Sequence, residues 1–263
     1  MLKEEQHVSN STEATEPLTY GAYMRVPELL ALQTPLGKPP VPDEMLFIIV
    51  QQAQELWFKQ LLYDLHNVVA DLHSADIASA NRLLTRSCRI LKVLGEEVAV
   101  LETMPPQEFK RFRHVLSQSS GFESEQFREL ELACGLREPA LLRVIDKHMD
   151  AEAMRTRWPI NLHDAFLERL ADMAAEPVDA VVRIYTHVAD FPRMYDLAEV
   201  LSEYEVLFSE WRFHHIKLVE RAIGDRSMGT AGSSGAGYLS RTLQYRFFPE
   251  LWEARNRITS GSE

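Results

Sequence analysis

Hydrophobic positions recur at helical spacing along most of the chain. Apolar residues return every three or four positions, and no alternating apolar and polar run bounded by turn residues indicates a β-strand or a hairpin. We therefore predict an all-α fold. The expected helices cover residues 21–33, 44–72, 76–103, 106–116, 124–135, 138–148, 160–174, 177–190, 198–223, 237–247 and 249–258.

The start of the first long helix has two features of its own. Asp43 follows the proline-rich segment 35–42 and resembles an N-cap residue. The next turns, with the sequence MLFIIV, are apolar on every side. We expect this end of the helix to be buried all round.

Neither a repeat nor a change in composition divides the chain. We expect a flexible segment over 1–17, a single helical domain over 18–258 and a short tail over 259–263. The polar N-terminus does not resemble a signal peptide, and no run approaches the roughly 18 apolar residues of a membrane span. The two cysteines, Cys88 and Cys134, form no CxxC pair, so we expect neither a disulfide scaffold nor a cysteine-based metal site. A cytoplasmic protein is the natural expectation.

The net charge of the chain argues against one class of binding partner. The 263 residues include 28 Lys and Arg against 39 Asp and Glu, which gives a formal net charge of −11. Nucleic-acid binding requires a concentrated excess of basic side chains, so we expect no nucleic-acid partner.

One imidazole lies within an apolar helical stripe. At about 100° per residue, His215 lies about 30° from the centre of the stripe, whereas His214 lies about 70° away. A hydrogen-bonded core histidine is the commoner explanation, and an axial ligand to a metal or a heme is the other. A single imidazole suits heme, which brings four ligands of its own. The stripe consists of Tyr204, Leu207, Phe208, Trp211, Leu218 and Ala222.

Two further segments contain candidate ligand-binding groups. The glycine-rich segment 228–237 is either a flexible connection or a loop that folds over a polar ligand with hydroxyls such as that of Thr230. Phe109 and Arg113 share one helical face, where the arginine is either a solvated surface residue or a fork for a carboxylate. Tyr20 and Tyr23 would ordinarily pack an amphipathic helix.

Six ordered blocks of sequence together resemble the tryptophan 2,3-dioxygenase family, which consists of all-helical heme enzymes. The resemblance implies a helical bundle with a heme pocket between long helices, heme b as cofactor, and O2 and a tryptophan-like molecule as substrates. The blocks are TYGAYMRVPELLALQ, DEMLFIIVQQAQELWFKQ, VLETMPPQEFKRFR, SSGFESEQFRELE, EWRFHHIKLVERAIG and GTAGSSGAGYL.

The resemblance also implies residue roles. His215 matches the proximal histidine on the heme iron, Arg113 the arginine that grips the substrate carboxylate, and Thr230 a loop threonine at the amino-acid end of the substrate. Phe109 stands where the family has Tyr or Phe, and Phe47 lines the indole pocket. The family forms homotetramers, in which residues matching Tyr20, Tyr23 and Met24 reach a neighbouring subunit's site.

Two positions depart from the family pattern. Gln51 stands where members normally carry a distal histidine; its carbonyl can accept a hydrogen bond from the indole N–H, but its amide cannot take up a proton near neutral pH. Val98 replaces a tryptophan common in bacterial members, and the smaller side chain is expected to reshape the heme pocket.

Three functions are compatible with this sequence. The first is a dioxygenase that converts tryptophan to N-formylkynurenine. The second is a specialised relative that places one oxygen at C2 of tryptophan, or of a ring- or β-substituted tryptophan, and yields a 2-oxindole amino acid for a natural-product pathway. The third is a heme- or indole-binding protein without turnover. Retention of His215, Arg113 and Thr230 favours an enzyme.

Overall fold

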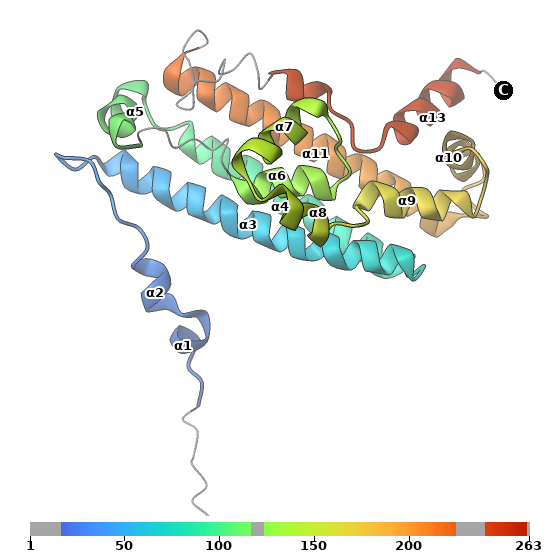
Figure 1. The fold of residues 1–263 in the computed structure, drawn as a ribbon, viewed down its shortest axis with the longest axis horizontal. Helices are drawn as coiled ribbons and strands as arrows, with labels where there is room; N and C mark the ends of the chain where they lie inside the picture. Colours follow the sequence, from blue (N-terminus) through green and yellow to red (C-terminus); the bar gives the residue numbers. More distant parts are fainter. Residues whose placement is uncertain (1–16, 117–123, 225–239, 262–263) are drawn as a thin grey trace, which may run out of the picture. The chain divides into compact units, whose positions relative to one another are not determined.

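The computed structural model describes residues 17–116, 124–224 and 240–261 (Figure 1). The chain divides into two compact units. The first ends at Thr34 and the second begins at Pro35. All regular structure in the described residues is helical, which confirms the all-α prediction. The single domain over 18–258 stays a prediction.

The N-terminal unit contains two short helices, α1 (Tyr20–Met24) and α2 (Val26–Leu30), where the pattern predicted one helix over 21–33. Arg25 between them adopts a left-handed conformation with φ 51°, which interrupts the helical hydrogen bonding. The hydroxyl oxygen of Thr19 caps α1 by accepting a hydrogen bond from the backbone N–H of Ala22 at 3.2 Å.

Three long helices form the frame of the second unit: α3 (Pro42–His73), α4 (Ile77–Leu101) and α11 (Pro192–Ile223). They lie side by side, with α4 in contact with both α3 and α11 (Figure 1). The last of them begins six residues earlier than the expected 198. Pro192 is its first residue, where the fixed φ of proline suits a helix and its missing N–H costs nothing.

Shorter helices cover this frame. Helices α6 and α9 pack against α3, and α10 packs against α9, α11 and α13. The sequence pattern missed α8. Of the helix expected over 237–247, residues 237–239 lie outside the described residues, and the rest includes the 3₁₀ turn η3. These elements are α5 (Pro106–Arg113), η1 (His114–Leu116), α6 (Glu125–Ala133), α7 (Pro139–His148), α8 (Ala151–Arg157), α9 (Leu162–Ala171), α10 (Pro177–Thr186), η3 (Thr242–Gln244) and α13 (Pro249–Ser260).

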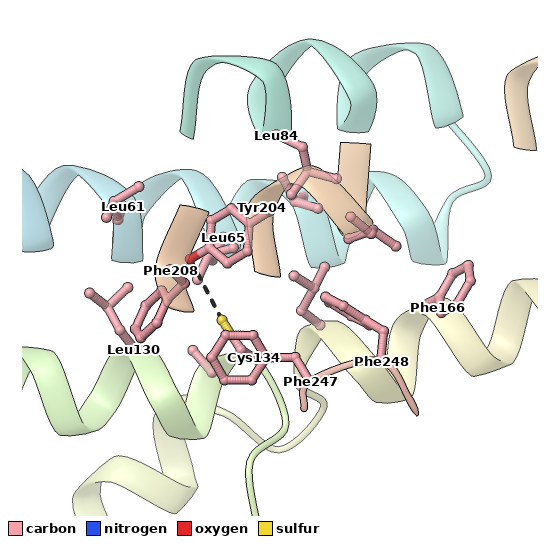
Figure 2. Packing of buried hydrophobic residues seen from close by; sticks show 14 of the residues in the cluster. Leu61, Leu65, Leu84, Leu130, Cys134, Phe166, Tyr204, Phe208, Phe247 and Phe248 are labelled. Carbon is pink, nitrogen blue, oxygen red and sulfur yellow. Dashed lines mark hydrogen bonds between the residues drawn. The ribbon is translucent and has the colours of Figure 1, made fainter. Parts of the chain in front are cut away.

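The main core lies between the long helices and α6, α9 and α13. Figure 2 shows Tyr204 and Phe208 of α11 among leucines of α3, α4 and α6. The thiol of Cys134 donates to the Tyr204 hydroxyl at 3.6 Å, and burial raises the pKa of this thiol to about 12. Cys88 and Cys134 are both free and buried, so they act as core residues.

The start of α3 differs from its prediction. Val41 is the N-cap residue, and Asp43 lies in the first turn, where its charge favours the positive end of the helix dipole. The apolar run is not buried on every side: Val50 is buried, but Ile49 is 49% exposed and Phe47 is partly exposed. The reason is position, since among the described residues this end of α3 meets α5 on one side and lies outside the main core.

No helix in the described ranges combines the length and the apolarity that crossing a bilayer requires.

Candidate functional site

One end of the bundle holds several of the predicted site residues, namely Phe47, Gln51, Phe109, Arg113 and His215. The amino-terminal end of α3 and the carboxy-terminal end of α11 meet there with α5, which contacts both (Figure 1). Gly224 ends α11 with φ 84°, a conformation that glycine adopts without strain. His215 lies two turns before this end.

The helical register predicted for α11 is confirmed. Tyr204, Phe208 and Trp211 are buried, His215 is partly buried, and His214 is exposed. The imidazole of His215 stacks on the indole of Trp211, with ring centroids 5.3 Å apart and planes 8° from parallel.

Burial and a nearby cation keep His215 neutral. Loss of solvent, reinforced by the positive charge of Arg128, lowers the pKa of His215 to about 4. Arg128 is itself buried on α6 and pairs with Glu131 at 2.7 Å, and Glu131 also pairs with Arg212 of α11 at 2.7 Å. The neutral imidazole is the form that coordinates metals.

An aromatic cluster stands at the same end of the bundle. Phe47 of α3 lies 6.0 Å from Phe109 and 5.7 Å from Phe112 between ring centroids, and the two α5 rings are 5.3 Å apart. Val41 and Met104 complete its buried centre. The structure thus brings together Phe47 and Phe109, two of the candidate site residues, and their roles stay predictions.

Phe112, which the sequence interpretation missed, is the fully buried member of this cluster. Its spacing could have indicated this position, because Phe112 stands three residues after Phe109 and therefore on a neighbouring face of the same helix.

Polar side chains stand one helical turn away from these rings. Gln51 follows Phe47 by four residues on α3, and Arg113 follows Phe109 by four residues on α5, so each pair shares a helical face. Both polar side chains are partly buried. An amide and a guanidinium beside an aromatic surface can bind a ligand that is apolar at one end and anionic at the other.

Glu44, in the first turn of α3, holds the segment that leads into this helix. Its buried carboxylate accepts hydrogen bonds from the backbone N–H groups of Leu36 at 2.7 Å and Gly37 at 2.9 Å. A Cβ on Gly37 would lie 2.6 Å from the carboxylate of Glu44, so a larger residue there would displace this carboxylate from its hydrogen bonds.

Val98 occupies a different environment. Its side chain on α4 is fully buried within the main core. The neighbouring Glu97 accepts a hydrogen bond from the Trp57 indole at 3.0 Å, and burial raises the pKa of this carboxyl group. The effect of Val98 on a heme pocket stays a hypothesis.

The remaining predicted site residues are not placed against this cluster. Thr230 lies outside the described residues. Tyr20, Tyr23 and Met24 belong to the N-terminal unit, where their side chains are 77%, 72% and 49% exposed. Their roles at a neighbour's site stay predictions.

An open groove of about 690 Å³ lies elsewhere, between α4, α11 and α13, and its lining residues include none of the predicted site residues.

The donor set around His215 indicates which kind of metal centre it suits. Within the described residues, no three side chains among His, Cys, Asp and Glu are grouped so that they could hold a metal ion. A single neutral imidazole therefore fits a metal whose other ligands come from an organic ring. The buried Trp211 Nε1–H, which lacks a partner in the described part of the chain, also leaves a donor for such a group.

Comparisons with known proteins identify relatives over most of the chain. The family model for tryptophan 2,3-dioxygenase matches residues 3–152 and 143–258. The tryptophan 2,3-dioxygenase of Herpetosiphon aurantiacus is 38% identical over 259 residues, which cover 92% of this chain and 98% of that relative.

Two Xanthomonas proteins, from X. euvesicatoria pv. vesicatoria and X. campestris pv. campestris, carry the same name. They are 38% and 37% identical over 268 residues, which cover 94% of this chain and 90% of each relative. Matches of this extent and identity show that the chain is a member of the tryptophan 2,3-dioxygenase family.

Proposed function

We propose that this chain is a heme-dependent tryptophan 2,3-dioxygenase that inserts both atoms of O2 across the C2–C3 bond of the tryptophan indole and yields N-formylkynurenine. The observation that carries the proposal is His215, a lone neutral imidazole on the apolar face of α11, at the end of the bundle where α5 contributes an aromatic cluster.

In this proposal His215 holds the heme iron as its protein ligand. The bound heme supplies the site at which O2 binds and is activated. The chain's own task is then mostly to position the substrate and to exclude water from the indole. Family membership and the chemistry of the donor set support this assignment of the cofactor.

The substrate is held by groups of α3 and α5. Phe47 and Phe109 offer an apolar surface to the indole, and the planar fork of Arg113 binds the α-carboxylate. The side-chain carbonyl of Gln51 accepts a hydrogen bond from the indole N–H. Because an amide does not take up a proton near neutral pH, the reaction proceeds without a distal base. Thr230 contacts the amino-acid end of the substrate.

We further propose a cytoplasmic homotetramer in which Tyr20, Tyr23 and Met24 complete a neighbouring subunit's site. Several large apolar side chains are exposed on the N-terminal unit, and a concentration of this kind is typical of an interaction surface. The free thiols of Cys88 and Cys134 suit a reducing compartment.

The test compares two adjacent histidines in the full chain. Reduced, heme-loaded wild-type protein should convert L-tryptophan to N-formylkynurenine. His215→Ala should lose both the five-coordinate ferrous heme spectrum and turnover, whereas His214→Ala should keep both, because His214 is exposed. Retention of the spectrum and turnover by His215→Ala would overturn the assignment.

A further inference from the structure

Trp211 is the aromatic neighbour of His215, the proposed iron ligand. It precedes His215 by four residues on α11, so the two side chains share one face. Their rings are nearly parallel, at 8°, with centroids 5.3 Å apart. Rotation of the imidazole about its long axis would therefore bring it against the indole.

The indole is itself held in place. Trp211 is 7% exposed, and its ring packs against Phe127 of α6 at 4.8 Å and Phe58 of α3 at 5.9 Å between centroids. Aromatic contacts from two other helices leave the ring little freedom. The plane of the imidazole is consequently fixed by packing rather than by a hydrogen bond from the described residues.

The Nε1–H of Trp211 is buried and has no hydrogen-bond partner in the described part of the chain. Such a donor has lost its hydrogen bonds to water without gaining a partner, so leaving it unsatisfied is destabilising.

The other three tryptophans each donate this group to a glutamate carboxylate. Trp57 donates to Glu97 at 3.0 Å, Trp158 to Glu129 at 2.9 Å and Trp252 to Glu205 at 2.6 Å. Trp211 alone among the four has no acceptor of this class among the described residues.

A bound heme would bring such an acceptor, since heme b carries two propionate carboxylates. Two buried arginines, Arg128 and Arg212, share the single carboxylate of Glu131 on this side of the site, and the net positive charge of this group favours an anion.

We propose that Trp211 is a positioning residue for the cofactor: its ring fixes the plane of the His215 imidazole, and its Nε1–H donates to a carboxylate of the bound heme. This inference rests on the proposed function, because it requires heme on His215.

Two substitutions separate the two parts of this role. Trp211→Phe keeps an aromatic ring against His215 and removes the N–H, whereas Trp211→Leu removes both. Trp158→Phe is the matched control, because Trp158 is also buried and stacks on a histidine, His66, with centroids 3.9 Å apart and planes at 10°. Heme release to excess apomyoglobin reports the hydrogen bond, and the iron–histidine stretching band in the Raman spectrum of the ferrous protein reports the imidazole.

Trp211→Phe should release heme about 10-fold faster, as expected for loss of a hydrogen bond to a charged group, while its iron–histidine band stays in place. Trp211→Leu should also shift and broaden the band, and Trp158→Phe should change neither readout. Thermal melts monitored by circular dichroism verify folding, and if the leucine variant does not fold, the phenylalanine variant decides.

Wild-type release rates and an unchanged band in both Trp211 variants would show that this tryptophan only fills the core. A wild-type protein that binds no heme, or shows no iron–histidine band, would instead overturn the proposed function and this inference with it.

Discussion

At the scale of single residues, the role proposed for Arg113 depends on the shape of its side chain. Replacing it with lysine keeps the charge but loses the planar fork that grips two carboxylate oxygens. Arg113→Lys should weaken tryptophan binding by about 1–3 kcal/mol, because charge-assisted hydrogen bonds are lost. Tryptamine, which lacks the carboxylate, is the control ligand and should bind both proteins alike in a titration of the ferric heme spectrum. Equal losses for both ligands would assign Arg113 a structural role.

The role proposed for Gln51 concerns the choice of product. Wild-type protein has no titrating group at this position, so its activity should not follow a distal pKa. Gln51→His introduces an imidazole that titrates at about pH 6.5 and that can guide the second oxygen atom. We expect any mono-oxygenated side product to decrease relative to N-formylkynurenine in chromatography with mass detection. An unchanged ratio would indicate that this residue does not select the product.

At the scale of elements, a buried carboxylate joins α6 to the end of α8. Glu129 accepts hydrogen bonds from Arg157 at 2.8 and 2.6 Å and from the Trp158 indole at 2.9 Å. Burial alone would raise the pKa of Glu129, but these hydrogen bonds outweigh it and lower the pKa below the usual 4.5. The contribution to stability is therefore present above about pH 4.5 and is lost as the pH falls through the folded-state pKa.

Glu129→Gln should accordingly destabilise the protein by about 1–3 kcal/mol at pH 7, a range that allows for the solvent exposure of Arg157. The difference from wild type should shrink below about pH 4.5. Thermal melts of the two proteins across this range measure the effect, and a difference independent of pH would contradict it.

The helices themselves were largely predictable, since their apolar periodicity extends through α3, α4 and α11. Their ends were less so. Pro42 and Pro192 are the first residues of their helices, whereas the apolar pattern predicts starts at 44 and 198. Arg25 interrupts the first expected helix with a left-handed backbone conformation, although it is not one of the residue types that usually adopt this conformation. Glu205 accepts hydrogen bonds from the backbone N–H groups of Phe247 and Phe248, just ahead of α13. These partners lie more than 40 positions along the chain, and such pairings leave no local signal in the sequence.

The candidate site was predictable to a similar degree. Helical spacing distinguished His215 from His214, but the choice between a core histidine and a metal ligand came from the family resemblance. The stack on Trp211 and the burial of Phe112 depend on how α3, α5, α6 and α11 pack, which spacing along one helix does not determine.

At the scale of the whole molecule, the proposed assembly predicts complementation between inactive chains. One chain carries Tyr20→Ala and Tyr23→Ala but keeps His215, and the other carries His215→Ala but keeps both tyrosines. In mixed oligomers, the heme site of the first chain receives the tyrosines of the second, so activity should reappear when the two are co-expressed. Mixtures no more active than the separate chains would place these tyrosines in their own subunit's site or outside any site.

At this scale, the proposed dioxygenase function is tested most directly by counting the oxygen atoms transferred to tryptophan. Reduced, heme-loaded wild-type protein is supplied with L-tryptophan under ¹⁸O2, and the product is analysed by mass spectrometry before it exchanges oxygen with water. We predict N-formylkynurenine with both added oxygen atoms labelled. A 2-oxindole amino acid with one labelled atom, or unchanged tryptophan, would contradict the proposed dioxygenase function.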